Sequence, residues 1–315
     1  MPVDRHAKRM LDFLAAAGAG RTGAPSAEER RQTLRALSQS AEAEPAPVGR
    51  VEDLAIPAGH GAIPVRIYAG STASPSSALV YFHGGGWVAG GLDTHDGFCR
   101  RLANSAACQV LAVDFRLAPE HPFPAALEDC LTAFQWVATN ARLLGIEPSR
   151  LAIGGDSTGA GLAAAVCMLL RERDGPRPAL QVLICPVLDV LRDTGSRHAL
   201  GQGYFVEPRV FERDLRDYCP EGVDPRDSRV SPLMATDFAG LPAAIVHTAE
   251  FDPFCDEGQA YACALAQAKV AAREVRHAGM IHYFYAMART IPYAEQAARM
   301  IGSDIRAALG GVDEA

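Results

Sequence analysis

Short apolar runs alternate with longer amphipathic stretches over most of the chain. Five nearly all-apolar runs predict strands, at residues 78–82, 109–115, 150–156, 179–186 and 243–250. Helical patterns fall between and after these runs, at residues 96–107, 125–143, from Ser157 onward and at 293–309. Strands that are apolar on both faces belong inside a sheet covered on both sides. The alternation therefore predicts a mainly parallel α/β sheet flanked by helices.

The first part of the chain departs from this alternation. Residues 1–45 predict helices, and Ser26 followed by Glu29 fits a capping box at the start of one of them. Residues 51–58 and 63–69 then predict two strands of an antiparallel hairpin.

A polar insert interrupts the alternation near the middle of the chain. Residues 188–225 carry several charges and aromatic side chains and predict helical material laid over the sheet edge. We expect this insert and residues 1–45 to form a helical cap above the strand ends. Residues 46–187 and 226–315 would then form the α/β domain that contains the sheet.

Composition and charge argue against several classes of protein. The chain has 315 residues with 30 Lys and Arg and 37 Asp and Glu, so its net charge is −7, and it has no long basic run. This argues against binding to nucleic acid or to an anionic membrane. No segment approaches the ~18 apolar residues of a membrane span, and the N-terminal stretch, interrupted by Asp12, predicts a helix rather than a signal peptide. Eight cysteines without a C-x-x-C pair predict buried thiols in a cytoplasmic protein.

The sharpest chemical motif is Gly155-Asp156-Ser157-Thr158-Gly159, which matches G-x-S-x-G. It joins a predicted strand directly to a predicted helix. Such a tight turn exposes a serine hydroxyl, and the helix N-terminus favours negative charge beside it. We therefore predict that Ser157 is the nucleophile of an acyl-transfer reaction.

A second motif, His83-Gly84-Gly85-Gly86-Trp87, follows the predicted strand at 78–82. Consecutive glycines let backbone N–H groups point toward one place, as is needed where negative charge develops on a carbonyl oxygen. We predict that Gly84, Gly85 and the N–H of Thr158 are the oxyanion donors. We expect His83 to fix the loop rather than to act as a base.

A serine nucleophile needs a base to take its proton. After Ser157 the histidines are His198, His247, His277 and His282. His198 lies in the polar insert, His247 lies inside a predicted strand as a core histidine, and His277 lies in another strand. His282 lies in the loop just after that strand, where a base can reach a serine at the strand ends, so we predict it as the base.

The base in turn needs an acidic group that orients it. Asp252 follows the predicted strand at 243–250 by two residues, so it occupies the same kind of loop one strand earlier, and we predict it as the acid. Asp256 and Glu257 are nearby alternatives, but we expect them to begin the next helix, where the helix dipole favours acidic residues. Glu250 is expected to be structural.

In this order, the motifs resemble the hormone-sensitive-lipase-like branch of the α/β-hydrolases, the microbial carboxylesterases. The resemblance extends over about residues 50–310, through the segments HGGGWVAGGLDTHDGFCRRLA, DFRLAPEHPFPAALED, GGDSTGAGLAA, AEFDPFCDEG and AGMIHYFY. It implies an eight-stranded sheet, a helical cap, ester hydrolysis without a metal or cofactor, and the site roles given above. Because edge-strand association is common in that family, the resemblance also allows a homodimer.

Two departures from the family pattern concern the substrate. The family usually has Ala after the nucleophile, where this chain has Thr158, and often has Gly-Phe after the histidine, where this chain has Tyr283 and Phe284. Neither change removes a catalytic group. Tyr204, Phe205 and Tyr283 are the candidate residues of the substrate pocket.

The sequence therefore predicts a serine carboxylesterase that hydrolyses short- to medium-chain esters and needs no partner other than a small-molecule ester. Hydrolysis of amides, carbamates or lactones by the same triad is the alternative. A catalytically silent ligand-binding receptor of the same fold is a remote alternative, because such a protein is expected to have lost a member of the triad.

Overall fold

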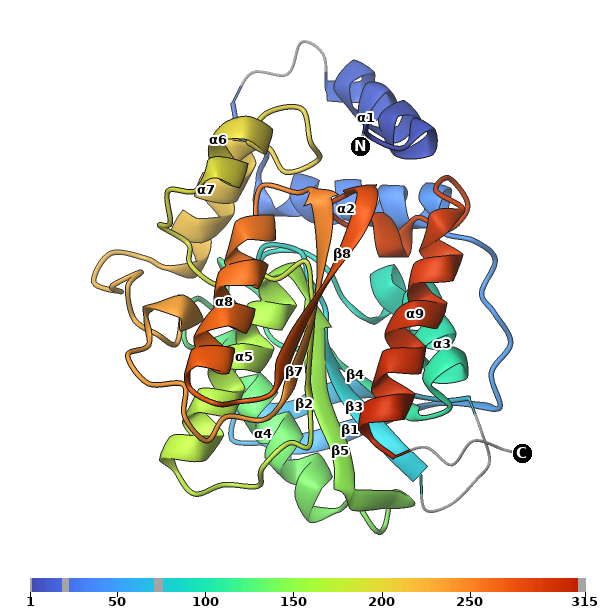
Figure 1. Cartoon of the computed structure of the whole chain (residues 1–315), viewed down its shortest axis with the longest axis vertical. Helices are drawn as coiled ribbons and strands as arrows, with labels where there is room; N and C mark the ends of the chain where they lie inside the picture. Colours follow the sequence, from blue (N-terminus) through green and yellow to red (C-terminus); the bar gives the residue numbers. More distant parts are fainter. Residues whose placement is uncertain (1, 19–22, 71–75, 311–315) are drawn as a thin grey trace.

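The computed structural model describes residues 2–18, 23–70 and 76–310. These residues form a twisted eight-stranded sheet of order β1-β2-β4-β3-β5-β6-β7-β8 (Figure 1). β2 runs antiparallel to β1 and β4, and the other neighbouring strands are parallel. The predicted hairpin and the predicted mainly parallel sheet are confirmed. The strands are β1 (Arg50–Ala58), β2 (Gly61–Ala69), β3 (Ser76–Phe82), β4 (Gln109–Val113), β5 (Ile146–Asp156), β6 (Gln181–Ile184), β7 (Ala244–Phe251) and β8 (Ala272–Ile281).

Helices cover both faces of this sheet. α3 (Leu92–Ala106) and α9 (Tyr293–Ala308) lie on one face, and α4 (Ala125–Thr139), α5 (Ser157–Glu172) and α8 (Cys255–Gln267) lie on the other (Figure 1). Each face has its own cluster of buried apolar side chains. The apolar character of β3 to β7 on both sides is thereby explained, since each strand packs against helices above and below.

Four further helices lie beyond the carboxyl ends of the parallel strands. They are α1 (Arg5–Gly18), α2 (Ala27–Ala41), α6 (Gly195–Leu200) and α7 (Pro208–Tyr218) (Figure 1). The predicted capping box begins α2, because Ser26 and Glu29 exchange side-chain and backbone hydrogen bonds. Arg30 of α2 forms an ion pair of 2.8 Å with buried Asp214 of α7, which ties the N-terminal helices to the insert. This arrangement fits the predicted cap.

Several element boundaries differ from the predicted ones, and two of these differences have a local cause in the chain. The helix expected at 96–107 begins at Leu92, because the chain turns at Gly91, whose φ of +152° suits glycine. The strand expected at 109–115 ends at Val113, where it leaves the sheet for a loop with cis bonds before Pro119 and Pro124. Short 3-10 turns at Pro232–Met234 and Phe284–Ala286 complete the described elements.

Two predictions about composition can be compared with the described residues. No helix among them is both long enough and apolar enough to cross a membrane. The eight cysteines are free thiols, and most are buried as predicted, although Cys263 is exposed.

Candidate active site

The nucleophile turn lies between β5 and α5. Ser157 has a φ of +52°, in the left-handed region that a tight strand-to-helix turn imposes on this residue. A Cβ atom would lie 2.3 Å from the carbonyl oxygen of Phe82 if placed on Gly155, and 2.1 Å from the same oxygen if placed on Gly159. The turn can therefore pack against β3 only with glycine at both flanking positions.

Side chains from three separate loops meet at the carboxyl edge of the sheet. Ser157 begins α5, Asp252 follows β7, and His282 follows β8. His282 Nε2 lies 3.0 Å from Ser157 Oγ, and His282 Nδ1 lies 2.7 Å from Asp252 Oδ2. All three residues are at most 8% exposed. In this geometry His282 can accept the serine proton while Asp252 accepts the hydrogen on Nδ1.

The glycine loop after β3 packs against the nucleophile turn. The N–H of Gly84 donates to Asp156 Oδ1 at 2.9 Å, and the N–H of Gly86 donates to Thr158 Oγ1 at 3.1 Å. Gly84 was predicted as an oxyanion donor, but in this structure its N–H already donates to a buried carboxylate. The N–H of Gly85 has no acceptor among the described residues, and the N–H of Thr158 lies in the first turn of α5, where a helix offers no acceptor.

Comparison with known proteins agrees with this geometry. The pattern of the alpha/beta hydrolase fold family matches residues 79–286, which include the candidate nucleophile, acid and base. The chain belongs to the α/β-hydrolase family. It is 43% identical to carboxylic ester hydrolase LipN of Mycobacterium tuberculosis, over 76% of this chain and 66% of LipN, just under two thirds of that relative.

Other relatives of this α/β-hydrolase are also named for ester hydrolysis. It is 38% identical to ethyl acetate hydrolase of Pseudomonas putida, over 80% of each chain. Among solved structures, an ester hydrolase from the metagenome of Lake Arreo matches with a TM-score of 0.93 and 39% identity, over 98% of this chain and 99% of that one. The predicted branch, the hormone-sensitive-lipase-like α/β-hydrolases, and the predicted class of carboxylic ester hydrolases are confirmed.

Asp156 belongs to the site, although no role was predicted for it from the sequence. It is fully buried beside the nucleophile, and it accepts hydrogen bonds of 2.6 Å from the phenols of Tyr81 and Tyr285 as well as the bond from Gly84. Burial acts to raise the pKa of Asp156, but His95 and the hydrogen bonds outweigh it and lower that pKa to about 2. The signal in the sequence was an acidic residue at the end of an apolar strand. A carboxylate buried there requires hydrogen-bond partners. Asp156 thus joins β3, the glycine loop and the nucleophile turn.

Aromatic side chains lie beside the histidine of this α/β-hydrolase. The ring of Phe205, from the insert, stacks on Tyr283 with centroids 5.6 Å apart and lies 6.0 Å from the His282 ring. Tyr204 stacks instead on Phe251, at the end of β7. Two of the three predicted pocket residues therefore lie next to the histidine, and the third packs beside the strand that precedes the acid.

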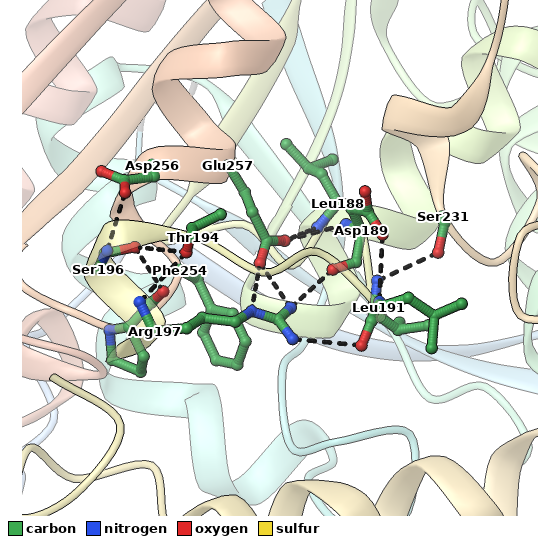
Figure 2. Close-up of polar contacts among 12 residues, drawn as sticks. Leu188, Asp189, Leu191, Thr194, Ser196, Arg197, Ser231, Phe254, Asp256 and Glu257 are labelled. Atoms are coloured by element: carbon green, nitrogen blue, oxygen red, sulfur yellow. Dashed lines mark hydrogen bonds and ion pairs between the residues drawn. The ribbon is translucent and has the colours of Figure 1, made fainter. Parts of the chain in front are cut away.

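The acid loop is fastened to the insert by a buried ion pair. Glu257, in the first turn of α8, is fully buried and accepts the N–H groups of Leu188 and Asp189 at 2.8 and 2.9 Å. Arg197 of α6 donates to the same carboxylate through Nε and Nη2, at 3.0 and 2.6 Å, and also to two backbone carbonyls of the insert (Figure 2). Burial raises the pKa of Glu257 to about 7, against the opposing effect of Arg197 and the two amides.

The contacts of Arg197 extend through Phe254 to His282, the candidate base. The Arg197 guanidinium lies 5.0 Å from the ring centroid of Phe254, and Phe254 packs edge-on against His282 at 5.6 Å. Ser196 adds hydrogen bonds to the carbonyl of Pro253 and to Asp256 (Figure 2). Glu257 was expected only to favour the start of a helix; its partner lies 60 residues away in the sequence, and nothing in the local pattern indicates it.

The remaining histidines occupy structural positions. His247 is buried inside β7, and its Nδ1 lies 3.1 Å from Nε2 of His277 in β8. His83 shares a hydrogen bond of 2.8 Å with the carbonyl of Gly84 through Nδ1 and stacks on Phe115, as expected for a residue that fixes the loop. His198 is exposed and pairs with Asp193.

One group of side chains in the described part of the chain has the spacing of metal ligands. Ligand atoms of Cys185, Asp252 and His282 lie within 4.8 Å of one another. Here the Asp252 carboxylate faces the imidazole Nδ1, and burial raises the pKa of the Cys185 thiol well above its usual value. Both features favour a hydrogen-bonded triad with a neutral thiol beside it over a coordinated ion, which requires a thiolate.

Proposed function

We propose that this chain is a serine carboxylesterase that hydrolyses short- to medium-chain esters through an acyl-enzyme. The observation that carries the proposal is the continuous path of hydrogen bonds from Ser157 through His282 to Asp252, with distances of 3.0 and 2.7 Å. A serine hydroxyl is a weak nucleophile until a base takes its proton. Asp252 would hold the imidazole in the required tautomer and stabilise the imidazolium that forms.

The reaction would proceed in two acyl transfers. Ser157 Oγ attacks the ester carbonyl while its proton moves to His282 Nε2, and negative charge develops on the carbonyl oxygen. His282 then protonates the departing alcohol, which leaves an ester between the acyl group and Ser157. Water repeats these steps in place of the serine, so that the free acid and the original hydroxyl are released.

The preference for shorter esters is supported by three observations. Phe205 and Tyr283 lie beside His282, so bulky rings occupy space next to the base. A relative with 38% identity is named ethyl acetate hydrolase, an enzyme for an ester with very short groups on both sides. The helices of the predicted cap lie over the strand ends, which favours an enclosed pocket rather than an open lipid-binding face (Figure 1).

The test is hydrolysis of p-nitrophenyl esters from acetate to palmitate by the wild type and by Ser157→Ala. Ser149→Ala is a matched control, since Ser149 is exposed on β5 and bonds only to nearby Glu147. We expect turnover to be highest for the shorter chains, unchanged in the control and lost in Ser157→Ala. Higher turnover of palmitate than of butyrate would contradict the chain-length proposal, and an active Ser157→Ala variant would contradict the mechanism.

The competing reactions are tested with matched substrates. Ester, amide, carbamate and lactone versions of one acyl group are compared by kcat/KM, and we expect the ester to be hydrolysed fastest.

A further inference from the structure

The hydrogen bonds of the glycine loop leave it with fewer free donors than its three glycines suggest. The N–H of Gly84 donates to Asp156, and the N–H of Gly86 donates to Thr158 Oγ1. Only Gly85, of the three, has an N–H without an acceptor among the described residues. A backbone donor that is already satisfied contributes little to a developing oxyanion, because the new bond must replace an existing one.

The hydroxyl that accepts the N–H of Gly86 belongs to Thr158, the residue directly after the proposed nucleophile. Thr158 is 2% exposed, and its own N–H lies in the first turn of α5. A threonine hydroxyl can accept hydrogen bonds and still donate one. Its oxygen accepts from Gly86 at 3.1 Å, and no acceptor for its hydrogen is found in the described part of the chain. Thr158 therefore retains two donors, one backbone and one side-chain, at the head of the helix.

We propose that the Thr158 hydroxyl replaces the Gly86 amide as a donor to the ester carbonyl oxygen. The oxyanion would receive hydrogen bonds from the N–H groups of Gly85 and Thr158 and from the O–H of Thr158. Gly86 would keep its bond to Oγ1, and this bond polarises the hydroxyl, since hydrogen bonds in a chain strengthen one another. No proton is transferred in this contact. The inference rests on the proposed acyl-transfer function.

Substitutions at position 158 separate this role from simple packing. Thr158→Val keeps the shape, but it removes the hydroxyl and sets a methyl group against the N–H of Gly86, so the oxyanion loses one donor and Gly86 cannot replace it. Thr158→Ser keeps the hydroxyl. Thr158→Ala removes the hydroxyl but uncovers the N–H of Gly86, which can then serve in its place.

The experiment measures kcat and KM with p-nitrophenyl acetate for these three variants. We expect kcat of Thr158→Val to fall on the order of a hundredfold with KM nearly unchanged, because loss of one oxyanion donor has this effect. Thr158→Ser and Thr158→Ala should stay within about tenfold of wild type. Thr248→Val is the matched control, because Thr248 is fully buried in β7 and its hydroxyl contacts only Glu274.

A second readout follows the transition state directly. A trifluoromethyl ketone adds to the serine and carries an oxyanion. Its inhibition constant should therefore rise in Thr158→Val by the same factor by which kcat/KM falls. If Thr158→Val does not fold, Thr158→Cys takes its place, because a thiol is a weak donor, and it should be at least tenfold slower than Thr158→Ser. Equal rates for valine and wild type, or for cysteine and serine, would overturn the inference. An inactive wild type would instead contradict the proposed function.

Discussion

His282 Nδ1 lies 2.7 Å from Asp252 Oδ2, and both side chains are almost fully buried. The second carboxylate oxygen of Asp252 accepts the N–H of Phe254 at 2.9 Å. The carboxylate is thereby held at both oxygens, and its orientation is set by the loop that precedes α8. A hydrogen on His282 Nδ1 leaves the lone pair of Nε2 directed to Ser157.

Replacing this carboxylate by an amide should disable the base without disturbing the fold. In Asp252→Asn the amide group can donate to Nδ1 and so favours the tautomer in which Nε2 carries the hydrogen. We expect kcat on p-nitrophenyl acetate to fall roughly 10³- to 10⁴-fold, the size of effect produced by a wrong histidine tautomer in serine hydrolases. Thermal unfolding should change little.

Asp256→Asn provides the control for this substitution. Asp256 lies four residues further on, in the first turn of α8, and accepts the N–H of Ser196 without contacting His282. The Asp256→Asn variant should retain activity within a few-fold of the wild type. A loss in Asp256→Asn as large as that in Asp252→Asn would mean that the acid has been assigned to the wrong residue.

The fold was predictable because its signals are local and repeated. The apolar runs that became β3 to β7 have no polar face, which only a sheet covered by helices on both sides can accommodate. The order of the motifs around Ser157, Asp252 and His282 was also readable, since parallel strands bring their carboxyl ends to one edge of the sheet. Each of the three residues lies at or just beyond the end of such a strand.

The remaining features of the site depend on contacts that no local pattern contains. Which amide of the glycine loop is free depends on where each N–H points, and that is decided by Asp156 and Thr158, more than 70 residues away. In the same way, the place of Glu257 in the first turn of α8 could be predicted from the sequence. The ion pair that this buried carboxylate forms with Arg197 of the insert could not. Sequence spacing identifies the residue types that can react, while tertiary packing decides which donors remain available.

The pair formed by Arg197 and Glu257 should matter more at high pH than at low pH. The pKa of Glu257 rises from 4.5 to about 7 in the folded chain, so this acid costs stability as pH rises through that interval. Arg197→Met removes the cation and raises the pKa further, so the cost of ionising Glu257 increases. Removing one partner of a buried ion pair typically costs about 3–5 kcal/mol, and we expect this loss at pH 8 and a smaller one at pH 5.

Urea unfolding at both pH values measures this difference. Arg213→Met is the control, because Arg213 forms a partly exposed pair with Asp217 on α7, and such pairs contribute about 0–1 kcal/mol. We also expect kcat of Arg197→Met to fall, since the guanidinium packs on Phe254, which contacts His282. A destabilisation of equal size at pH 5 and pH 8 would show that Glu257 does not titrate in this interval.

Neutral buried histidines should make the protein less stable toward acidic pH. His83 is 3% exposed, its Nε2 has no partner among the described residues, and its Nδ1 faces the carbonyl of Gly84. A hydrogen on Nδ1 satisfies that carbonyl and leaves the ring neutral. Burial, together with His95, lowers the pKa of His83 from 6.5 to about 4.

Between pH 6.5 and 4 the unfolded chain therefore binds a proton at His83 that the folded chain does not bind, so the free energy of unfolding falls as the pH falls. The full effect of this one group is about 3 kcal/mol, because a tenfold change in proton affinity corresponds to about 1.4 kcal/mol. His83→Asn keeps a donor for Gly84 but does not titrate. The free energy of unfolding of this variant should therefore depend less steeply on pH, by the equivalent of up to one bound proton. Urea unfolding at half-unit steps of pH measures both slopes. The slope will not vanish in the variant, because burial also lowers the pKa of His247 and of His277. Identical slopes in variant and wild type would mean that folding does not lower the pKa of His83.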